Sequence, residues 1–442
     1  MSNPLRIDLS AHVARARIAP GPQPEGRVRE VIGVLVEVEG LVAPIGGQLE
    51  VPTDERRLLL EVIGFRDGRL LAAPLGSTTG IVPGARVRLS AHAHIVAVGD
   101  AQLGRILDAF GQPLDGRPPP VVEGTAKLQA RPPPPFLRRP IVEALPTGVR
   151  AIDSLLPLGR GQRIGLFAGT GVGKSTLLGM LCKHSGADII VVGLIGERGR
   201  EVGDFVRGAL GERGLARSIV VAATSDTPPL VRARAALRAT AIAEHFRAQG
   251  KSVLLVMDSV TRYAMALREA SLAAGEPPLT KGYTPTVFAA LPSLLERTGN
   301  DAGPGSITAV YTVLVEGDDL NDPIADAVRG ILDGHVVLSR KLADRGLYPA
   351  IDVLRSISRV ANDIAAPGQV DLMLRAKDAL STYADAADLI QIGAYVAGSD
   401  PRIDASRAVV PRLEALIRQK ADDGVARPAA IAALRSAVEG RP

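Results

Sequence analysis

The segment Arg163-Ile-Gly-Leu-Phe-Ala-Gly-Thr-Gly-Val-Gly-Lys-Ser-Thr-Leu-Leu178 begins as an apolar run, passes through a glycine-rich loop and continues in a helical pattern. A strand, a loop and a helix in this order form the context in which a P-loop binds phosphate. Gly169, Gly171 and Gly173 allow backbone conformations closed to other residues, so that successive N–H groups can converge on phosphate oxygens. The helix that begins near Gly173 adds the positive end of its dipole. The segment therefore predicts a phosphate-binding site.

Two side chains at the end of this loop suit the chemistry of Mg·ATP. Lys174 stands where it would contact the β- and γ-phosphates, and the Ser175 hydroxyl where it would ligate Mg²⁺. The first loop position is Ala168 where the usual motif has glycine, and a small residue suffices there. The predicted nucleotide-binding residues of the loop are Gly169, Thr170, Gly171, Val172, Gly173, Lys174, Ser175 and Thr176.

A second apolar run, Val253-Leu-Leu-Val-Met-Asp258, ends in a carboxylate. In open α/β sheets, ligands lie beyond the carboxyl ends of the strands, which places Asp258 near the phosphate loop. Its predicted role is to hold the magnesium ion, directly or through water. The predicted metal-binding pair is therefore Ser175 and Asp258.

Hydrolysis also needs a group that orients water and positive charge beyond that of the lysine. Glu197 comes just after the apolar run Ile189–Ile195, which is the next run along the chain from the phosphate loop. It is the best candidate for the water-activating carboxylate, although local sequence alone also allows Glu-Arg pairing at a helix start. An additional arginine on the γ-phosphoryl oxygens can accelerate phosphoryl transfer by about 10³ to 10⁵. The candidate arginines are Arg198, Arg262 and Arg359.

The segments around these motifs predict an α/β fold with three kinds of structure. Short β-type runs at Val28–Glu39, Arg57–Phe65 and Ala85–Val98, separated by glycine and proline, suggest a small β-barrel. Apolar runs then alternate with amphipathic helical patterns, as in a mostly parallel sheet with crossover helices. The end of the chain is rich in alanine and leucine at helical spacing. The expected strands of the sheet are Arg163–Phe167, Ile189–Ile195, Ile219–Ala223, Val253–Met257 and Ser306–Val313.

These patterns divide the chain into five parts. The leading segment 1–26 holds Leu5, Leu9 and Val13 at four-residue spacing, as in a short helix that docks on a partner or an acidic membrane surface, and a frayed terminus is the alternative. The other parts are a β-barrel domain at 27–98, a proline-rich connection at 99–146, a P-loop ATPase core at 147–367 and a C-terminal helical domain at 368–442.

Composition limits the classes of function that remain. The 442 residues are 46% apolar, yet no apolar run approaches the roughly 18 to 20 residues of a membrane span, and no secretory signal is visible, so we expect a cytoplasmic protein. A net charge of +5 fits an anionic partner, but aromatic residues are only 3% and tryptophan is absent. Stacking platforms for single-stranded nucleic acid need aromatic faces, so composition argues against nucleic acid.

The stretch Pro349-Ala-Ile-Asp-Val-Leu-Arg-Ser-Ile-Ser358, together with the motifs above, resembles the rotary F1-type ATPase α/β superfamily of hexameric rings over nearly the whole chain. This resemblance implies a RecA-like core. It also implies that Arg359 is an arginine finger reaching into the neighbouring subunit's site and that Tyr348 stacks on adenine. Glu197 then matches the catalytic carboxylate, and Arg198 and Arg262 match arginines near the γ-phosphate.

Three features narrow the resemblance within the superfamily. A non-catalytic subunit typically carries glutamine at the position of Glu197, so this chain should hydrolyse ATP. It holds both halves of a shared site, which implies a homohexamer. The stretch from Met257 to Phe288 is similar to the ATPases of type III protein export, and Leu389-Ile-Gln-Ile-Gly-Ala-Tyr395 stands where an F-type catalytic subunit has its acidic rotor-binding motif.

The resemblance therefore implies an ATPase of the flagellar type III export apparatus, because Thr280-Lys-Gly-Tyr283 and Val315-Glu-Gly-Asp-Asp319 look more flagellar than virulence-type. Such a ring would release chaperones from export substrates at the inner face of the cytoplasmic membrane. Its partners would be a stator or regulator protein, the export gate and chaperone–substrate complexes, with peripheral attachment to the membrane. The alternatives are a virulence (injectisome) export ATPase, a hexameric nucleic-acid translocase and an F/V-type ATP synthase catalytic subunit.

Overall fold

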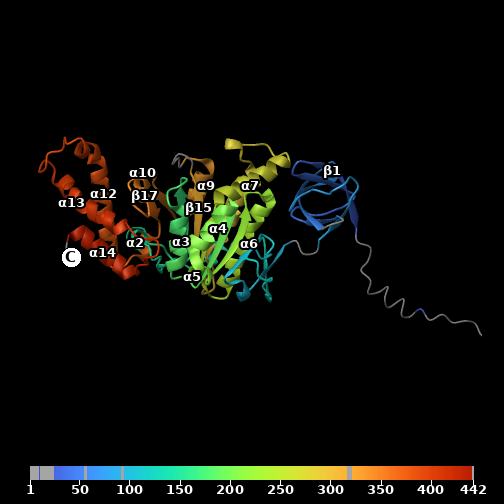
Figure 1. Cartoon of the computed structure of the whole chain (residues 1–442), viewed down its shortest axis with the longest axis horizontal. Helices are drawn as coiled ribbons and strands as arrows, with labels where there is room; N and C mark the ends of the chain where they lie inside the picture. The colour runs from blue at the N-terminus through green and yellow to red at the C-terminus, as the bar shows by residue number, and fades with distance from the viewer. Residues whose placement is uncertain (1–8, 10–23, 54–56, 91–93, 316–320, 441–442) are drawn as a thin grey trace, which may run out of the picture. The chain divides into compact units, whose positions relative to one another are not determined.

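The computed structural model describes residues 9, 24–53, 57–90, 94–315 and 321–440 of the chain (Figure 1). They belong to two compact units, Met1–Ala93 and His94–Pro442. Apart from Leu9, the docking helix predicted within the first twenty residues lies outside the described residues. The division into five parts stays a prediction, whereas the three kinds of structure are all present.

The first unit contains a closed barrel in the strand order β1-β2-β5-β4-β3-β6, as the sequence predicted. Inward-facing residues alternate along its strands, and valines and leucines such as Val38, Leu49 and Leu60 fill the interior. The run Val28–Glu39 is divided by a turn at Gly33, whose φ of 58° favours glycine. The strands are β1 (Glu25–Ile32), β2 (Leu35–Glu39), β3 (Gln48–Pro52), β4 (Arg57–Arg66), β5 (Arg69–Pro74) and β6 (Arg86–Leu89).

The second unit is built on a nine-stranded sheet in the order β17-β16-β10-β15-β13-β11-β12-β8, with β14 paired to β15. The five predicted strands are all present in it, and they are parallel to one another. The strands are β8 (Arg105–Leu107), β10 (Arg163–Ala168), β11 (Ile189–Glu197), β12 (Ser218–Thr224), β13 (Ser252–Asp258), β14 (Gly299–Asn300), β15 (Ser306–Leu314), β16 (Gly334–Leu338) and β17 (Ile351–Ser358).

Strand β17 differs from its neighbours because it runs antiparallel to β16 at the edge of the sheet. Its first residue, Ile351, pairs with Leu338 at the carboxyl end of β16, and its last residue, Ser358, pairs with Gly334 at the amino end. The chain before β17 therefore lies at the carboxyl edge of the parallel sheet, and the chain after it lies at the amino edge.

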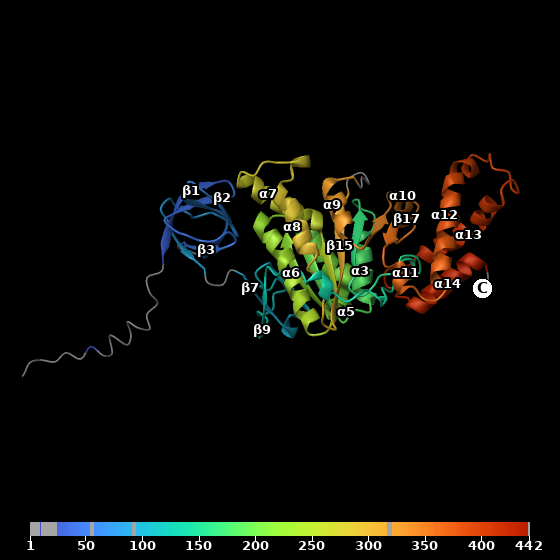
Figure 2. The same cartoon turned by 180° about the vertical axis from the view of Figure 1, so that it is seen from behind.

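Helices cover both faces of this sheet (Figures 1 and 2). On one face, α3 (Lys174–His184) joins a single apolar core with α2 (Arg150–Leu155), the π-helix η3 (Phe205–Leu210) and the C-terminal helices. On the other face, α6 (Pro229–Ala248) contacts β11, β12 and β13, and α7 (Val260–Ala273) contacts β11 and β15. The central strands β10, β11, β13 and β15 are thus buried on both faces, which explains why they read as continuous apolar runs.

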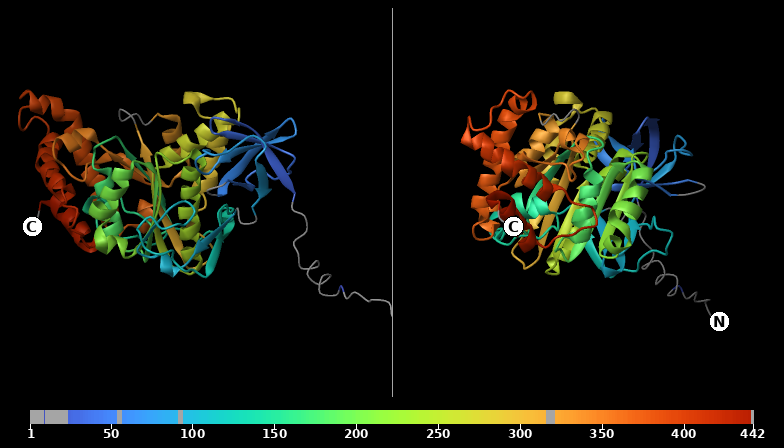
Figure 3. Two further views of the ribbon diagram at one scale, coloured as in Figure 1. Left: turned by 45° about the vertical axis from the view of Figure 1, so that its right-hand side comes forward. Right: turned by 60° about the vertical axis from the view of Figure 1, so that its left-hand side comes forward.

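Three helices form the C-terminal part, as the alanine- and leucine-rich pattern predicted (Figure 3). They are α12 (Gln369–Gln391), α13 (Pro401–Ile417) and α14 (Arg427–Glu439). Leu413, Leu416 and Leu434 extend the core of the sheet's first face into these helices. The strand β7 (Ile95–Val98), expected as part of the barrel, instead pairs with β9 (Gly124–Lys127).

The remaining elements are short or lie at the sheet margins. They are η1 (Asp100–Gln102), η2 (Pro135–Leu137), α4 (Gly199–Asp204), α5 (Gly211–Leu215), η4 (Thr280–Gly282), α8 (Pro285–Leu295), α9 (Pro323–Ile331), α10 (Arg340–Asp344) and α11 (Ala361–Ile364).

A buried ion pair joins α6 to the segment after α8. Arg297, which is 1% exposed, donates through Nε and a terminal nitrogen to both oxygens of Glu244, at 2.9 and 2.6 Å. Replacing Arg297 with methionine leaves the Glu244 carboxylate, whose side chain is only 14% exposed, without its partner. We expect Arg297→Met to lower the free energy of unfolding by about 3 to 5 kcal/mol.

This expectation is checked by urea denaturation of the full chain, followed by circular dichroism. Arg329→Ala is the matched control, because Arg329 pairs with Asp326 at 2.7 Å on the exposed side of α9. An exposed pair of this kind contributes less than about 1 kcal/mol. Equal losses in the two variants would contradict the prediction.

Candidate functional site

The predicted phosphate loop lies at the carboxyl end of β10 and leads into α3. Gly171 and Gly173 have φ of 79° and 91°, which a side chain would oppose, and Gly173 caps the helix that begins at Lys174. Gly169 continues from β10 without a positive φ. Val172 is 1% exposed and anchors the loop in the core beneath it.

Lys174 meets two carboxylates at the base of this loop. Its Nζ contacts Oδ1 of Asp258, the last residue of β13, and lies 3.9 Å from Oε1 of Glu197, the last residue of β11. The Thr312 hydroxyl donates to the same Asp258 oxygen at 2.7 Å. The parallel strands thus deliver both predicted acids to the phosphate loop, as the rule for open α/β sheets requires.

A β-bulge sets the position of Glu197. The register between β11 and β12 shifts between Ile195 and Glu197, and Gly196 at the bulge has φ of 72°. Such a bulge bends the strand and redirects the next side chain. A Cβ added at Gly196 would lie 3.0 Å from the Cβ of Arg262, so glycine also lets α7 approach β11 closely.

The environment of Glu197 favours its neutral form. Burial, with the neighbouring charge of Asp258, raises the pKa of Glu197 to about 7, against the lowering effect of Lys174, and a hydrogen bond with Glu201 raises it further. That hydrogen bond and Arg198 hold the pKa of Glu201 below its usual range. A carboxylate with a pKa near neutrality is suited to accept a proton from water at physiological pH.

A cavity of about 330 Å³ opens above the phosphate loop. Eleven of the predicted residues line it, and they are Gly169, Thr170, Gly171, Gly173, Lys174, Ser175, Thr176, Glu197, Arg198, Asp258 and Arg262. The structure therefore brings together the phosphate-binding, metal-binding and water-activating candidates. Val172, Tyr348 and Arg359 are not among the lining residues.

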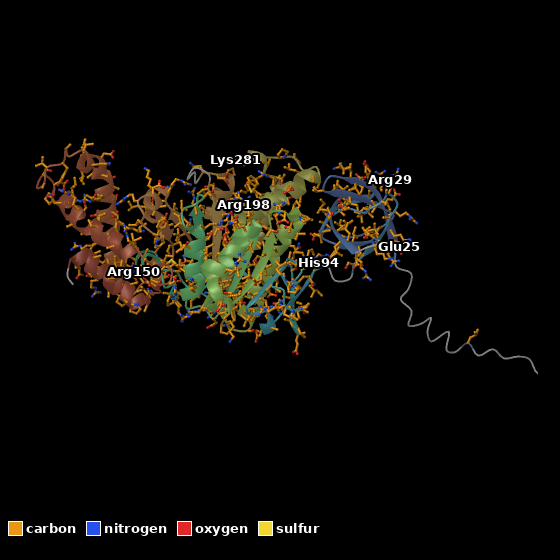
Figure 4. The ribbon with its side chains drawn as sticks, in the orientation of Figure 1. Glu25, Arg29, His94, Arg150, Arg198 and Lys281 are labelled. Carbon is orange, nitrogen blue, oxygen red and sulfur yellow. The ribbon has the colours of Figure 1, made fainter. Side chains whose placement is uncertain are left out.

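The two arginines that line the cavity differ in their surroundings. Arg198 is exposed (Figure 4) and pairs with Glu201, which also lines the cavity, at 3.0 Å. Arg262 is half-buried, and its buried Nε has no hydrogen-bond partner within the described residues. A buried donor without a partner costs free energy, so Arg262 is suited to receive an anionic oxygen of a ligand.

Tyr348 stands beside the phosphate loop although it does not line this cavity. Its ring carbons Cδ1 and Cε1 would lie 3.4 Å from a Cβ built on Gly173. The side chain is 44% exposed, so part of its ring is open to a planar ligand. Its position fits the base end of a nucleotide whose phosphates occupy the loop.

Arg359 lies far from the phosphate loop of its own chain. It follows the last residue of β17, and its backbone N–H donates to the backbone carbonyl of Asp333 at 3.0 Å, at the amino edge of the sheet. The eight residues of β17, at roughly 3.4 Å each, separate the two ends of the strand by about 25 Å. Its exposed side chain is therefore available to a neighbouring molecule and out of reach of Lys174 in the same chain.

The donors in the cavity fit a magnesium ion that is held together with phosphates. Mg²⁺ is usually bound through one or two carboxylates and substrate phosphate oxygens, and seldom by an all-protein cage. Ser175 and Asp258 offer one hydroxyl and one carboxylate. Within the described part of the chain, no group of three or more His, Cys, Asp or Glu residues could form a complete metal cage.

Sequence reasoning missed three residues that shape the site. They are Thr312, which donates to Asp258, Gly196 at the bulge, and Glu201 beside Glu197. A glycine inside an apolar run is a known sign of a bulge, so Gly196 carried a usable signal. Thr312 is a polar residue inside the apolar run of β15, whereas nothing local distinguishes Glu201 from any other surface acid.

Family models match three stretches of the chain. Residues 148–358 match the nucleotide-binding domain of the ATP synthase alpha/beta family, and residues 28–90 match the β-barrel domain of that family. Residues 365–436 match the model described as the T3SS EscN ATPase C-terminal domain. Together with the relatives below, these matches show that the chain belongs to the ATP synthase alpha/beta family.

Its relatives place it in a particular branch, the ATPases of type III protein export. The chain is 50% identical over 414 residues to the flagellum-specific ATP synthase of Bacillus subtilis (strain 168), covering 93% of this chain and 94% of the relative. It is 46% identical over 416 residues to a type 3 secretion system ATPase of Pseudomonas savastanoi pv. phaseolicola, covering 92% of both. The chain is thus an ATPase of this branch, as its sequence predicted.

A solved structure supports the same assignment. The assembled ATPase EscN from the enteropathogenic E. coli type III secretion system is 43% identical, with a TM-score of 0.89 over 93% of this chain and 100% of EscN. EscN is also solved in complex with its central stalk EscO. Among the residues that the structure of this chain describes, no helix has both the length and the apolar character needed to span a membrane.

Proposed function

We propose that this chain is the ATPase of a flagellar export apparatus and works as a homohexameric ring whose active sites lie between neighbouring chains. One observation carries the proposal. Strand β17 begins beside the chain's own phosphate loop and ends about 25 Å away, where it presents Arg359 at the opposite edge of the sheet. An exposed arginine at that edge can complete only a site in another copy.

Binding would begin at the phosphate loop. Backbone N–H groups from Gly169 to Ser175 would surround the phosphates, and Lys174 would exchange its contact with Asp258 for the β- and γ-phosphate oxygens. Ser175 and Asp258 would hold Mg²⁺, which neutralises charge on the phosphates when bound. Tyr348 would stack on the adenine.

Glu197 would orient the attacking water. The carboxylate lies 3.9 Å from Lys174 and at the end of β11, so water between it and the γ-phosphate would meet a proton acceptor with a pKa near 7. The bulge at Gly196 fixes the direction of this side chain. Arg262, and Arg198 at the rim, would stabilise negative charge on the γ-phosphoryl oxygens.

Arg359 of the next chain would supply the last positive charge. Fixed donors aimed at developing charge act strongly in a site from which water is excluded. Because the finger comes from a neighbour, a single chain would bind nucleotide but would hydrolyse it slowly. Hydrolysis would therefore depend on assembly.

The relatives support the proposed cellular role. Flagellum-specific ATP synthases and type 3 secretion system ATPases both cover most of the chain, and the flagellar relative is the more similar of the two reported. We infer a ring at the inner face of the cytoplasmic membrane that detaches chaperones from export substrates and prepares the substrates for secretion. A stator or regulator protein, the export gate and a central stalk of the kind that EscN binds would be its partners.

Removal of the gene from its host tests this proposal. The deletion strain should lose assembled flagella and motility, because hook and filament subunits would stay inside the cell. A plasmid copy should restore motility, whereas Lys174→Ala on the same plasmid should not, since the phosphate loop loses its cation. Normal flagella together with lost secretion of virulence proteins would show that the chain serves an injectisome instead.

A further inference from the structure

The connection between α13 and α14, residues 418–426, is fastened to the nucleotide-binding core through Gln419. This glutamine is only 6% exposed. Its Oε1 accepts from the backbone N–H of Arg150 at 2.8 Å, and its Nε2 donates to the carbonyl of Gly148 at 2.8 Å and to that of Asp423. A buried side chain with its acceptor and both donor directions in use has a fixed orientation.

The backbone of the same residue holds Tyr348. The N–H of Gln419 donates to the Tyr348 carbonyl at 2.9 Å. The ring of Tyr348 stands beside Gly173 and is 44% exposed, so the core does not enclose it. The position of the ring therefore depends on how its backbone is attached, and Gln419 provides one of these attachments.

The connection is also attached to the far end of α3. His184 Nε2 lies 3.0 Å from the carbonyl of Ala421, and Lys183 Nζ lies 2.8 Å from Oδ1 of Asp422. The guanidinium of Arg150, the first residue of α2, donates to the carbonyl of Arg418. Residues 418–426 thus form a bracket between the helix that begins at Lys174 and the strand that begins after Tyr348.

We propose that Gln419 is a positioning residue for the nucleotide base. It anchors the bracket to Gly148 and Arg150, and so keeps Tyr348 at stacking distance from a base whose phosphates lie in the loop. This inference rests on the proposed function, in which Tyr348 stacks on adenine. It adds a residue from the C-terminal helical part to the determinants of nucleotide affinity.

The test compares two ligands on the full chain. Mg·ADP carries base and phosphates, whereas inorganic tripolyphosphate with Mg²⁺ carries phosphates alone. Dissociation constants are measured by calorimetry for the wild type, Tyr348→Ala, Gln419→Ala and the double variant. We expect either single change to weaken Mg·ADP about tenfold, which corresponds to about 1.4 kcal/mol, in the range for loss of one stacking contact.

Tripolyphosphate affinity should change by less than about twofold in these variants, because the phosphate loop is intact. The double variant should bind Mg·ADP no more weakly than Tyr348→Ala alone, since both changes remove the same contact. This ratio between two ligands separates positioning of the base from general damage to the fold.

Gln369→Ala is the matched control. Gln369 is fully buried, and its Nε2 donates to the carbonyls of Asp153 and Ser154 at 2.9 and 3.0 Å, also between α2 and the C-terminal helices. No hydrogen bond joins it to Tyr348. We expect its loss to lower the melting temperature as much as Gln419→Ala does, while the ratio of the two affinities stays unchanged.

Where Gln419→Ala does not fold, Gln419→Glu replaces it, because glutamate keeps the acceptor for Arg150 and loses the donor to Gly148. Equal weakening of both ligands would overturn the inference, since Gln419 would then act on the phosphate loop. Wild-type Mg·ADP affinity in Gln419→Ala, with weak binding in Tyr348→Ala, would overturn it as well. Wild-type affinity in Tyr348→Ala would refute the stacking role in the proposed function, and the inference with it.

Discussion

A Glu197→Gln chain is expected to bind Mg·ATP with wild-type affinity and to hydrolyse it about 10² to 10⁴ times more slowly, the usual contribution of a general base. Glutamine has the shape of glutamate, so the bulge at Gly196 and the packing at the end of β11 should persist. The amide accepts no proton from water. It also removes a carboxylate next to Asp258, so nucleotide affinity should not fall.

Single-turnover hydrolysis and nucleotide binding, measured on the same assembled sample, separate the two effects. Glu212→Gln provides the control, because Glu212 is an exposed carboxylate of α5 outside the cavity that lies over the phosphate loop. It should hydrolyse ATP at the wild-type rate. Turnover near wild type in Glu197→Gln would mean that another group positions the water.

An Arg359→Ala chain is expected to assemble, to bind Mg·ATP and to lose hydrolysis by about 10³ to 10⁵, the range for an arginine finger. Binding should survive because Arg359 lies at the amino edge of the sheet, away from its own phosphate loop. The loss should appear in the maximal rate, since the finger acts on charge that develops in the transition state. Arg375→Ala, on the exposed side of α12, serves as the control.

Mixing two inactive chains gives the sharper result. Arg359→Ala retains its phosphate loop and Lys174→Ala retains its finger, so an interface with the first chain's loop and the second chain's finger is complete. In randomly mixed rings about a quarter of the interfaces have this composition, and activity should return to roughly that fraction. In the wild type, specific activity should rise steeply with protein concentration. A specific activity that stays constant while the protein is monomeric would falsify the shared site.

The sequence was sufficient to pick out side chains that the structure brings together around one cavity, because their determinants are local. The order of β10, loop and α3 is continuous in the chain, and the apolar runs of β11 and β13 end at Glu197 and Asp258. The parallel arrangement of these strands then decides that both acids reach Lys174. Periodicity and composition were likewise sufficient for the barrel and for the helical end of the chain.

What sequence reasoning missed depends on contacts between distant segments. Thr312 becomes a partner of Asp258 only through the pairing of β13 and β15. Gln419 reaches Tyr348 only after α13 has folded against the core. The separation between Tyr348 and Arg359 follows from the antiparallel direction of β17, which no local sequence pattern predicts.

The antiparallel direction of β17 bears on how many complete active sites an assembly of these chains can hold. In the proposed ring, β17 would begin at one chain's nucleotide and end at the next chain's phosphates, which is a head-to-tail interface in which two different surfaces meet. An open arc of such chains would always have one fewer complete site than it has chains, because Arg359 of the chain at one end would have no neighbouring phosphate loop to complete. Only closure gives every chain a working site, so ring closure itself would act as the final switch for hydrolysis.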